Sequence, residues 1–339
     1  MRDQVLGRRT KGTRVSRRHV HALGAVLQHV DLAQIDGLSD DRRSCKCYRR
    51  FCLAAKENRE QVDPESTERT SSVAPAAPSI LGGSERPVFQ KRLDCLGVSV
   101  TQTTWYELRQ WFFAAAKRRG PARVLFIANA HTLNLTWNNP RFRQVLRRAD
   151  VVLNDGIGLE IYALIAGETF AENFIGTDLI PRLFESADPD TPLRVFLYGA
   201  KPARAEAAAR SIRDRFPNVR VVGTIDGYTR DGVIEAINAV SPDLLLVGMG
   251  NPLQEVWIDE NRTKIDVGVA VGVGALIDVL SGEVARAPYL MRRLRAEWLF
   301  RLALEPKRMF RRYVFGNPAF LWRSMLYVRF GIGSERRTT

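Results

Sequence analysis

The chain has few of the residues and patterns that define several large protein classes. Only four of its 339 residues are cysteines, which is too few for a disulfide-rich secreted scaffold. Its apolar runs are all shorter than the roughly 18 residues that a membrane-spanning helix needs. The basic N-terminus is not followed by the long apolar core of a secretory signal. These absences favour a protein with reduced thiols in a cytosolic setting.

Two common nucleotide-binding signatures are also missing. No G-x-x-x-x-G-K-[S/T] stretch occurs, which excludes a P-loop ATPase. The glycine pairs Gly156/Gly158 and Gly272/Gly274 do not continue into a complete G-x-G-x-x-G fingerprint, so an NAD(P) enzyme is disfavoured. One D-x-D pair is present, at 188–190. It precedes an expected strand, at the wrong edge for a nucleotide-sugar metal site, and is interpreted as a polar turn.

Three of the cysteines are grouped in residues 45–52, CKCYRRFC, while Cys95 stands alone. With His19, His21 and His29 upstream, the group raises the alternative of a zinc site. Its spacing fits no standard zinc pattern well. We therefore expect no metal and no cofactor.

The net charge of +14 is unevenly distributed. Residues 1–90 carry 16 Lys/Arg against 11 Asp/Glu, a net +5, and residues 91–283 carry 22 against 23, a net −1. Residues 284–339 carry 13 against 3, a net +10. A basic C-terminal region is typical of proteins that bind an anionic partner such as a phospholipid surface or a nucleic acid.

Residues 1–87 are expected to form a disordered or weakly structured extension and linker. They are polar and end in DPESTERTSSVAPAAPSILGGSERP, which cannot bury much apolar surface. A short helix is expected near residues 20–30. A start site assigned too far upstream would explain such a segment equally well.

From residue 88 to residue 283, apolar runs alternate with amphipathic segments. Short strands that are apolar on both faces, alternating with helices, predict a mostly parallel sheet covered by helices on both sides. The fold class is therefore α/β and Rossmann-like, followed by a basic helical appendage over residues 284–339. The expected strands lie at 124–129, 151–155, 195–199, 219–225, 244–250 and 267–274.

Each expected strand ends in small or polar residues. Ligands of open α/β sheets bind outside these carboxyl ends, where glycines let the backbone approach a phosphate. Six such ends favour a nucleotide-type pocket along that edge. The residues are Asn129, Asp155, Gly199, Asp226 with Gly227, Gly250 with Asn251, and Gly272 with Gly274.

Two titratable residues at this edge are candidates for catalysis. Asp155 ends the run VVLND and precedes Gly156, a position that suits either a simple turn or a general base. His131 is the only histidine after residue 88, and its alternatives are a helix cap or a catalytic role beside Asn129 and Thr132.

Several motifs resemble those of the WecG/TagA/CpsF glycosyltransferases, glycosyltransferase family 26. The resemblance covers about residues 93–315. The motifs occur in family order: NDGIGLE, IGTDLI, FLYGA, GTIDGY, SPDLLLVGMGNPLQEVWI, GVGALIDVLSGEVARAP and AEWLFRLALEPKRMFRRY.

This resemblance implies an inverting enzyme with a Rossmann-like fold and a C-terminal appendage. Members move an N-acetylhexosamine-type sugar, typically N-acetylmannosamine or its uronic acid, from a UDP donor to a sugar on a polyprenyl diphosphate. The family's proposed base falls on Asp155. Two positions depart from the family pattern, because Ile127 stands where a Thr is common and Asn173 where an Arg is common. The donor or acceptor can therefore differ, and His131 or Thr132 is hypothesised to replace part of the missing polar function.

The remaining site expectations follow from the motifs and from the need to stabilise a leaving diphosphate. Without a well-placed D-x-D pair we expect metal independence, with C-terminal arginines neutralising the diphosphate. The expected substrate-binding residues are Asn129, Thr132, Asn134, Gly156, Gly176, Thr177, Asp178, Tyr198, Gly199, Asp226, Gly227, Tyr228, Gly250, Asn251, Gln254, Glu255, Arg286, Arg295, Arg301 and Arg308.

The C-terminal region mixes arginines with aromatic residues. That mixture suits either nucleic-acid binding or an interfacial helix on anionic lipid, and a lipid-linked acceptor favours the membrane surface. The leading hypothesis is a glycosyltransferase of surface polysaccharide or cell-wall polymer synthesis, peripheral to the inner face of the cell membrane. No nucleic acid is expected as a partner, and a second copy of the chain, in a homo-oligomer, is among the partners considered. The alternative is a non-catalytic nucleotide- or nucleic-acid-binding module on the same fold.

Overall fold

A computed structural model describes residues 89, 91–285, 287–288, 291 and 297–331. The expectations for residues 1–87, including the cysteine group and the upstream histidines, lie outside the described residues. The division into an extension, a core and an appendage at residues 87 and 283 stays a prediction.

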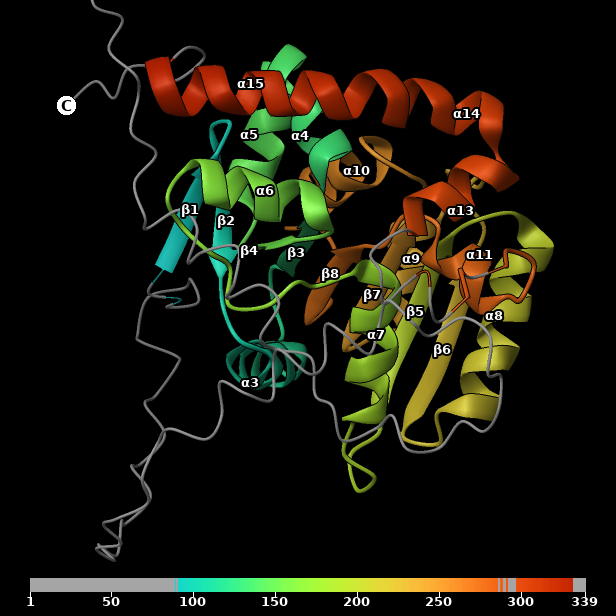
Figure 1. The fold of residues 1–339 in the computed structure, drawn as a ribbon. Coiled ribbons are helices and arrows are strands. Elements are labelled where there is room, and N and C mark those ends of the chain that lie inside the picture. The colour runs from blue at the N-terminus through green and yellow to red at the C-terminus, as the bar shows by residue number, and fades with distance from the viewer. Residues whose placement is uncertain (1–88, 90, 286, 289–290, 292–296, 332–339) are drawn as a thin grey trace, which may run out of the picture. The chain divides into compact units, whose positions relative to one another are not determined.

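The predicted α/β class is confirmed, because six parallel strands form the central sheet (Figure 1). Their order across the sheet is β4-β3-β8-β7-β5-β6. The strands are β3 (Arg123–Ala128), β4 (Val151–Asn154), β5 (Leu193–Gly199), β6 (Val219–Ile225), β7 (Leu244–Gly248) and β8 (Val269–Gly272). All six coincide with the predicted apolar runs to within a few residues.

The sheet is apolar on both faces because alternate side chains enter two separate cores. Leu125 and Leu246 belong to the core beneath one group of helices, and Phe126 and Leu245 to the core beneath the other. The first group is α3 (Trp105–Ala116), α7 (Gly176–Glu185), α8 (Pro202–Arg215) and α11 (Leu276–Leu280). The second group is α4 (Ala130–Asn138), α5 (Pro140–Arg148), α6 (Ile157–Ile165), α9 (Val233–Val240) and α10 (Leu253–Asn261).

One element was not predicted. Strands β1 (Lys91–Cys95) and β2 (Val98–Gln102) form an antiparallel hairpin whose turn residues, Leu96 and Gly97, both have positive φ. A two-residue turn of that conformation suits the twist of a hairpin. The sequence signal was weak because leucine is uncommon at such a position.

The C-terminal region is helical, as predicted. It contains α13 (Glu297–Leu304), α14 (Pro306–Phe310), a π-helical turn (Arg311–Phe315) and α15 (Gly316–Phe330). Figure 1 shows α15 extended above α4 and α6, and residue contacts join it to both helices. These two helices follow β3 and β4, so α15 is docked beside the carboxyl ends of those strands.

Side chains from both partners hold α15 in place. Phe320 is buried against Tyr162 of α6, with ring centroids 6.3 Å apart. Asn134 of α4 donates from Nδ2 to the Gly316 carbonyl at 2.7 Å and accepts from Arg323 Nη1 at 2.7 Å. At the far end of α15, the Tyr327 hydroxyl donates to Asp94 at 3.0 Å. The anchor is therefore both apolar and polar.

Replacing Phe320 with Ala is expected to lower the free energy of unfolding by about 4 kcal/mol, because the change leaves a cavity beneath α15. Urea unfolding followed by circular dichroism measures this loss. Trp322 lies on the same helix but is 61% exposed, so Trp322→Ala is the matched control and should change stability by no more than about 0.5 kcal/mol. Equal losses in the two variants would contradict the proposed anchor.

Candidate functional site

Asp155 is fixed at the carboxyl edge of the sheet, directly after β4. Its backbone N–H donates to the carbonyl of Ala128, the last residue of β3, at 2.8 Å. The next residue, Gly156, has φ +83° and opens α6. A residue with a Cβ would be strained in that conformation, so the glycine allows the chain to turn immediately after the acid.

A chain of hydrogen bonds joins Asp155 to two other strand ends. Asn129 follows β3 and caps α4, where its Oδ1 accepts from the backbone of His131 at 3.1 Å and of Thr132 at 3.2 Å. The same Asn129 side chain hydrogen-bonds the Asp155 carboxylate. Thr132 Oγ1 accepts from Asn251 Nδ2 at 3.0 Å, and Asn251 follows β7. Four predicted site residues are therefore brought together around Asp155.

The appendage adds charges of both signs to this carboxylate. Arg301 and Glu297 of α13 form an ion pair at 2.9 Å, and both act electrostatically on Asp155. Arg312, from the π-helical turn, donates to Asn129 Oδ1 at 3.4 Å and also acts on Asp155. The site is thus assembled from the sheet edge on one side and the appendage on the other.

These surroundings raise the pKa of Asp155 from its usual value to about 6. Burial is the largest cause, because it disfavours the charged carboxylate. The positive charge of Arg301 opposes this rise, the negative charge of Glu297 adds to it, and Arg312 opposes it less strongly than Arg301. The side chain is mostly ionised at neutral pH and remains basic enough to accept a proton, which is what a general base requires.

His131 lies next to the same group and is partly buried. Burial, and then the positive charge of Arg312, lower the pKa of His131 to about 4. The imidazole is therefore neutral at pH 7. A neutral ring can donate or accept one hydrogen bond but adds no charge to the site, so a catalytic role for His131 stays a prediction.

Gln254 and Glu255 lie deeper, at the ends of β7 and β8. Gln254 Oε1 accepts from the backbone of Gly250 at 3.2 Å and of Gly274 at 2.9 Å. Its Nε2 donates to Glu255 Oε1 at 2.7 Å. Glu255 Oε2 is buried with no hydrogen-bond partner among the described residues, and burial raises the pKa of this carboxyl to about 7. Gln254 therefore links the loops that follow β7 and β8, and Glu255 is buried beside it.

A third group lies at the ends of β5 and β6. Gly199 approaches Gly248 of β7 so closely that an added Cβ would lie 2.4 Å from the Gly248 carbonyl oxygen. The Tyr198 hydroxyl donates to the Thr229 carbonyl at 3.0 Å, and Asp226 Oδ1 accepts from the Tyr228 backbone at 2.8 Å. These bonds shape the loop after β6, and the Gly227 backbone donates to the Ala200 carbonyl at 2.9 Å.

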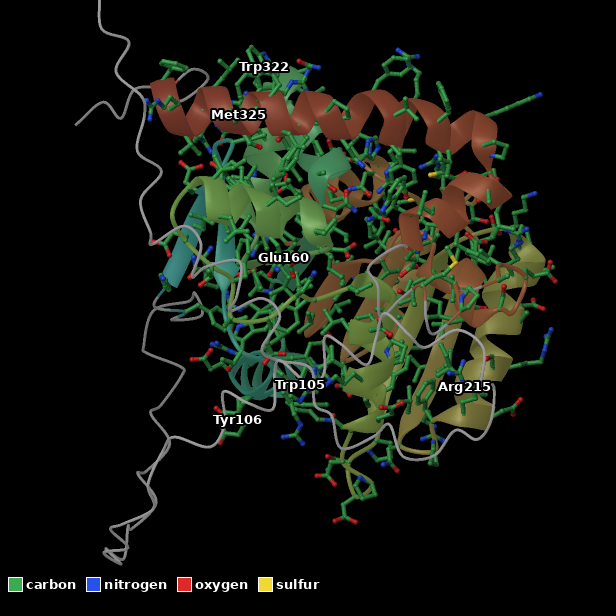
Figure 2. All side chains as sticks on the ribbon, viewed as in Figure 1. Trp105, Tyr106, Glu160, Arg215, Trp322 and Met325 are labelled. Atoms are coloured by element: carbon green, nitrogen blue, oxygen red, sulfur yellow. The ribbon has the colours of Figure 1, made fainter. Side chains whose placement is uncertain are left out.

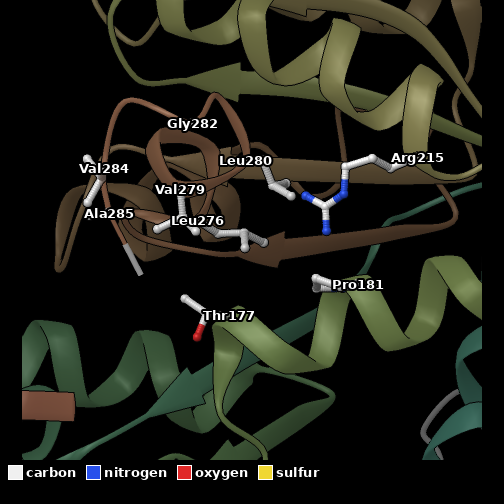
Figure 3. Close-up of a pocket in the computed structure, with 9 residues that line it drawn as sticks. All are labelled: Thr177, Pro181, Arg215, Leu276, Val279, Leu280, Gly282, Val284 and Ala285. Carbon is white, nitrogen blue, oxygen red and sulfur yellow. The ribbon is translucent and has the colours of Figure 1, made fainter. Parts of the chain in front are cut away.

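The residues Gly176, Thr177 and Asp178 begin α7. Gly176 leaves little room beside Ile127 of β3, because an added Cβ would lie 3.2 Å from that side chain. Thr177 lines a cavity of about 300 Å³ between α7 and α11, with Arg215 at its other end (Figure 3). Most of the lining is apolar, and Asp155 is not among the lining residues. The cavity therefore does not contain the Asp155 group.

The remaining predicted residues have other positions. The Asn134 side chain is used to hold α15. Arg286 and Arg295 lie outside the described residues, and so does the side chain of Arg308. Asn173, one of the two departures, accepts from the Gly156 backbone at 2.9 Å and donates to Glu160 at 2.9 Å. It therefore fixes the loop behind Asp155.

Sequence reasoning missed Glu297 and Arg312. The four-residue spacing of Glu297 and Arg301 was a usable signal for a helical ion pair. No local signal distinguished Arg312 from the other arginines, because its position depends on how the appendage docks. The D-x-D pair is a polar turn, as predicted, in which Asp188 accepts from the Asp190 backbone at 2.9 Å. No cluster of three potential metal-binding side chains occurs in the part of the chain that the structure describes.

A family model, described as the glycosyl transferase WecG/TagA/CpsF family, matches residues 93–332. The chain belongs to this family of glycosyl transferases. The match contains every described residue of the site and most of the appendage, so both lie within the part of the chain that resembles the family.

Curated relatives share substantial sequence with the chain. A protein of Bacillus spizizenii is 40% identical over 173 residues, which are 50% of this chain and 66% of the relative. A protein of Bacillus subtilis is 35% identical over 166 residues, which are 48% of this chain and 64% of the relative. A Staphylococcus aureus protein is 30% identical over 226 residues, 64% of this chain and 87% of the relative. All three are named N-acetylglucosaminyldiphosphoundecaprenol N-acetyl-beta-D-mannosaminyltransferase. The chain spans just under two thirds of the length of the two Bacillus proteins.

Two substitutions on α13 should move the pKa of Asp155 in opposite directions. Arg301→Ala removes a positive charge that favours the carboxylate and should raise the pKa above about 6, whereas Glu297→Gln removes a negative charge and should lower it. NMR titration of a protein carrying ¹³C-labelled aspartate measures both shifts. Movement in the same direction would contradict the arrangement of charges described above.

Glu255→Gln should remove a pH-dependent cost to stability. Burial raises the folded-state pKa of Glu255 from 4.5 to about 7, so the ionised carboxylate destabilises the folded protein. This cost grows as the pH rises from 4.5 and is complete once the pH exceeds about 7. The wild type should therefore lose roughly 3 kcal/mol between pH 5 and pH 8 relative to the variant. Urea unfolding at the two pH values measures the difference, and a pH-independent gap would contradict it.

Proposed function

We propose that the protein is an inverting glycosyltransferase. It transfers an N-acetylhexosamine-type sugar from a UDP donor to a sugar on a polyprenyl diphosphate, in the synthesis of a surface polysaccharide or cell-wall polymer. The observation that carries this proposal is the half-buried Asp155 carboxylate, held at the sheet edge beneath two arginines. Family membership and the names of the relatives support the same reaction class.

In the proposed reaction Asp155 acts as the general base. It takes the proton from an acceptor hydroxyl while that oxygen attacks the anomeric carbon of the donor sugar. The bond between this carbon and the diphosphate oxygen breaks as the new glycosidic bond forms, and UDP leaves with the electron pair. A single displacement of this kind inverts the configuration at the anomeric carbon. The proton remains on Asp155 until it passes to solvent.

The leaving diphosphate needs positive charge, which Arg301 and Arg312 supply. Both guanidinium groups lie close enough to affect the Asp155 carboxylate, and preorganised charges of this kind stabilise the transition state more than the ground state. The Asn129 amide orients the base, since its side chain is fixed by the first turn of α4. The chain therefore supplies a base, an orienting group and two cations without a large rearrangement.

The uridine is proposed to bind at the carboxyl ends of β5 and β7, because the helices that follow them, α8 and α10, cover opposite faces of the sheet. The close contact of Gly199 with Gly248 leaves backbone rather than side chains at these strand ends, which suits the approach of a nucleotide. Tyr228 is 70% exposed beside them and offers a ring for stacking. The Asn129, Thr132 and Asn251 side chains are proposed to bind the donor sugar next to Asp155.

The donor sugar is proposed only as an N-acetylhexosamine. The relatives are named for N-acetylmannosamine transfer, but Ile127 and Asn173 replace the polar and basic residues common at these positions. Ile127 packs on the first residue of α7, and Asn173 fixes the loop behind the base. The site thus lacks two side chains that are common in the substrate region of the family pattern, and a panel of UDP-sugars would identify the donor.

The appendage is proposed to rest on an anionic membrane surface. No helix among the described residues has the length and apolarity needed to cross a bilayer. Trp322 and Met325 of α15 are both exposed, and Figure 2 shows Trp322 on the side of the helix that faces away from the core. Exposed aromatic side chains beside arginines suit a helix lying in a lipid interface. The exposed residues include Phe310, Phe315, Trp322, Met325 and Phe330.

Asp155→Asn is expected to reduce turnover by about 10²- to 10⁴-fold, because the amide cannot accept the proton of the acceptor hydroxyl. The measurement is UDP release from a UDP-N-acetylhexosamine in the presence of an N-acetylglucosaminyl prenyl diphosphate. Binding of UDP to the variant should be retained and serves as the control. Unchanged turnover would remove Asp155 as the base. Tight, salt-sensitive RNA binding without UDP-sugar affinity would favour the binding-module alternative.

A further inference from the structure

We propose that Asn173 is the positioning residue of the base, and that Glu160 sets the direction of its amide. The inference rests on the proposed function, in which Asp155 is the base, and names the two side chains that fix the direction of its carboxylate. Asn173 acts through the backbone of Gly156, to which it is hydrogen-bonded, and not on a substrate.

The two peptide bonds that flank Asp155 are both held through their N–H groups. The N–H of Asp155 donates to the Ala128 carbonyl at 2.8 Å. The N–H of Gly156, which belongs to the next peptide bond, donates to Asn173 Oδ1 at 2.9 Å. Because a peptide bond is planar, the second hydrogen bond fixes the ψ angle of Asp155. Together the two bonds determine the direction in which the Asp155 side chain leaves the backbone.

Packing does not supply this restraint at Gly156. A Cβ added to Gly156 would meet no heavy atom of the described residues within 4 Å. Its φ of +83° is one of several conformations that glycine adopts without strain. Gly156 is also the N-cap of α6, and as a glycine it has no side chain to cap that end. The direction of the peptide bond after Asp155 therefore depends on the Asn173 amide.

Asn173 itself lies on a segment that is tied to β4 and to α3. Asn154 Nδ2 donates to the Glu172 carbonyl at 3.0 Å, and the Phe174 N–H donates to the Asn154 carbonyl at 2.9 Å. Glu172 Oε1 accepts from the backbone of Trp105, the first residue of α3, at 2.7 Å. The Phe174 side chain is buried in the core. The Asn173 backbone is therefore fixed on both sides, which makes its side chain a rigid support.

An amide matches both neighbours of the Asn173 side chain. The Gly156 N–H requires an acceptor, and Glu160 Oε1 accepts from Asn173 Nδ2 at 2.9 Å. An aspartate at this position would accept from Gly156 but would repel Glu160, and a leucine would bind neither. The Glu160 carboxylate also prevents the amide from turning over, because a reversed amide would direct its NH₂ group at the Gly156 N–H.

The test reverses the hydrogen bond between the two side chains. Asn173→Asp should lower kcat about 10- to 100-fold, because the repulsion from Glu160 displaces the support of the base. In the double variant Asn173→Asp/Glu160→Gln, the new amide donates to the new carboxylate, which still accepts from Gly156, and the net charge is that of the wild type. Its kcat should return to within about threefold of the wild-type value. UDP release is measured at pH 8.5, so that Asp155 is ionised in every variant.

A substrate-binding role for Asn173 predicts a different result. Positioning lowers kcat in Asn173→Asp and leaves the Kd of the UDP-sugar within about twofold of the wild type. Weaker binding of the UDP-sugar with an unchanged kcat would place Asn173 in donor binding and overturn the proposal.

The matched control is Asn238→Asp, at the amino edge of the sheet. Asn238 also uses both ends of its amide, since it donates to the Lys264 carbonyl at 2.8 Å and accepts from the Asp266 backbone at 2.8 Å. This variant should lose stability in urea and keep the wild-type kcat. A fall in kcat equal to that of Asn173→Asp would show a general effect of weakened folding and would overturn the proposal.

Hydrogen exchange of the Gly156 amide gives a readout that does not depend on sugar transfer. In a protein with ¹⁵N-labelled glycine, this amide should exchange about tenfold or more faster in Asn173→Leu than in the wild type. Unchanged exchange in this variant, or a double variant no more active than Asn173→Asp, would overturn the proposal. A wild type that releases no UDP would instead contradict the proposed function, and the exchange measurement would still test the support of Gly156.

Discussion

The docking of α15 onto α4 and α6 is the contact on which the site depends. Phe320 is buried beside α6, and Asn134 of α4 is hydrogen-bonded to α15 at two points. The two helices that receive α15 begin directly after Asn129 and Gly156, at the residues flanking the base. A single packing arrangement therefore places the appendage and its arginines over the carboxylate, because α13 and α15 are parts of one C-terminal segment.

This arrangement produces opposing electrostatic effects on Asp155. Burial disfavours its charge and the guanidinium groups of Arg301 and Arg312 restore part of it, so the pKa settles near 6 rather than at an extreme. The cost is in the free energy of unfolding, because the ionised carboxylate of Asp155 is more stable in water than in the folded protein. Glu255 carries a similar cost at the neighbouring strand ends. Destabilised acids of this kind concentrate at functional sites, where protein stability is exchanged for reactivity.

The sequence predicted the sheet well because strands buried on both faces are continuous apolar runs with polar ends. The same logic identified Asp155, Asn129, Thr132 and Asn251, which the fold brings together. It did not identify Glu297 and Arg312, because helix periodicity says which residues share a face and not what that face contacts. Asn134 is polar and lies in the same helix as Thr132, as a site residue would, yet its amide holds α15. Distinguishing such residues requires the tertiary arrangement.

The most direct test of the account is the pH dependence of kcat/KM for sugar transfer by the wild type. If Asp155 is a base tuned by burial and by the appendage, the rate should rise with pH through a midpoint near 6, as the carboxyl loses its proton, and then remain level. A profile that is flat from pH 5 to pH 8, or a midpoint near the 3.8 of an ordinary aspartate, would contradict it.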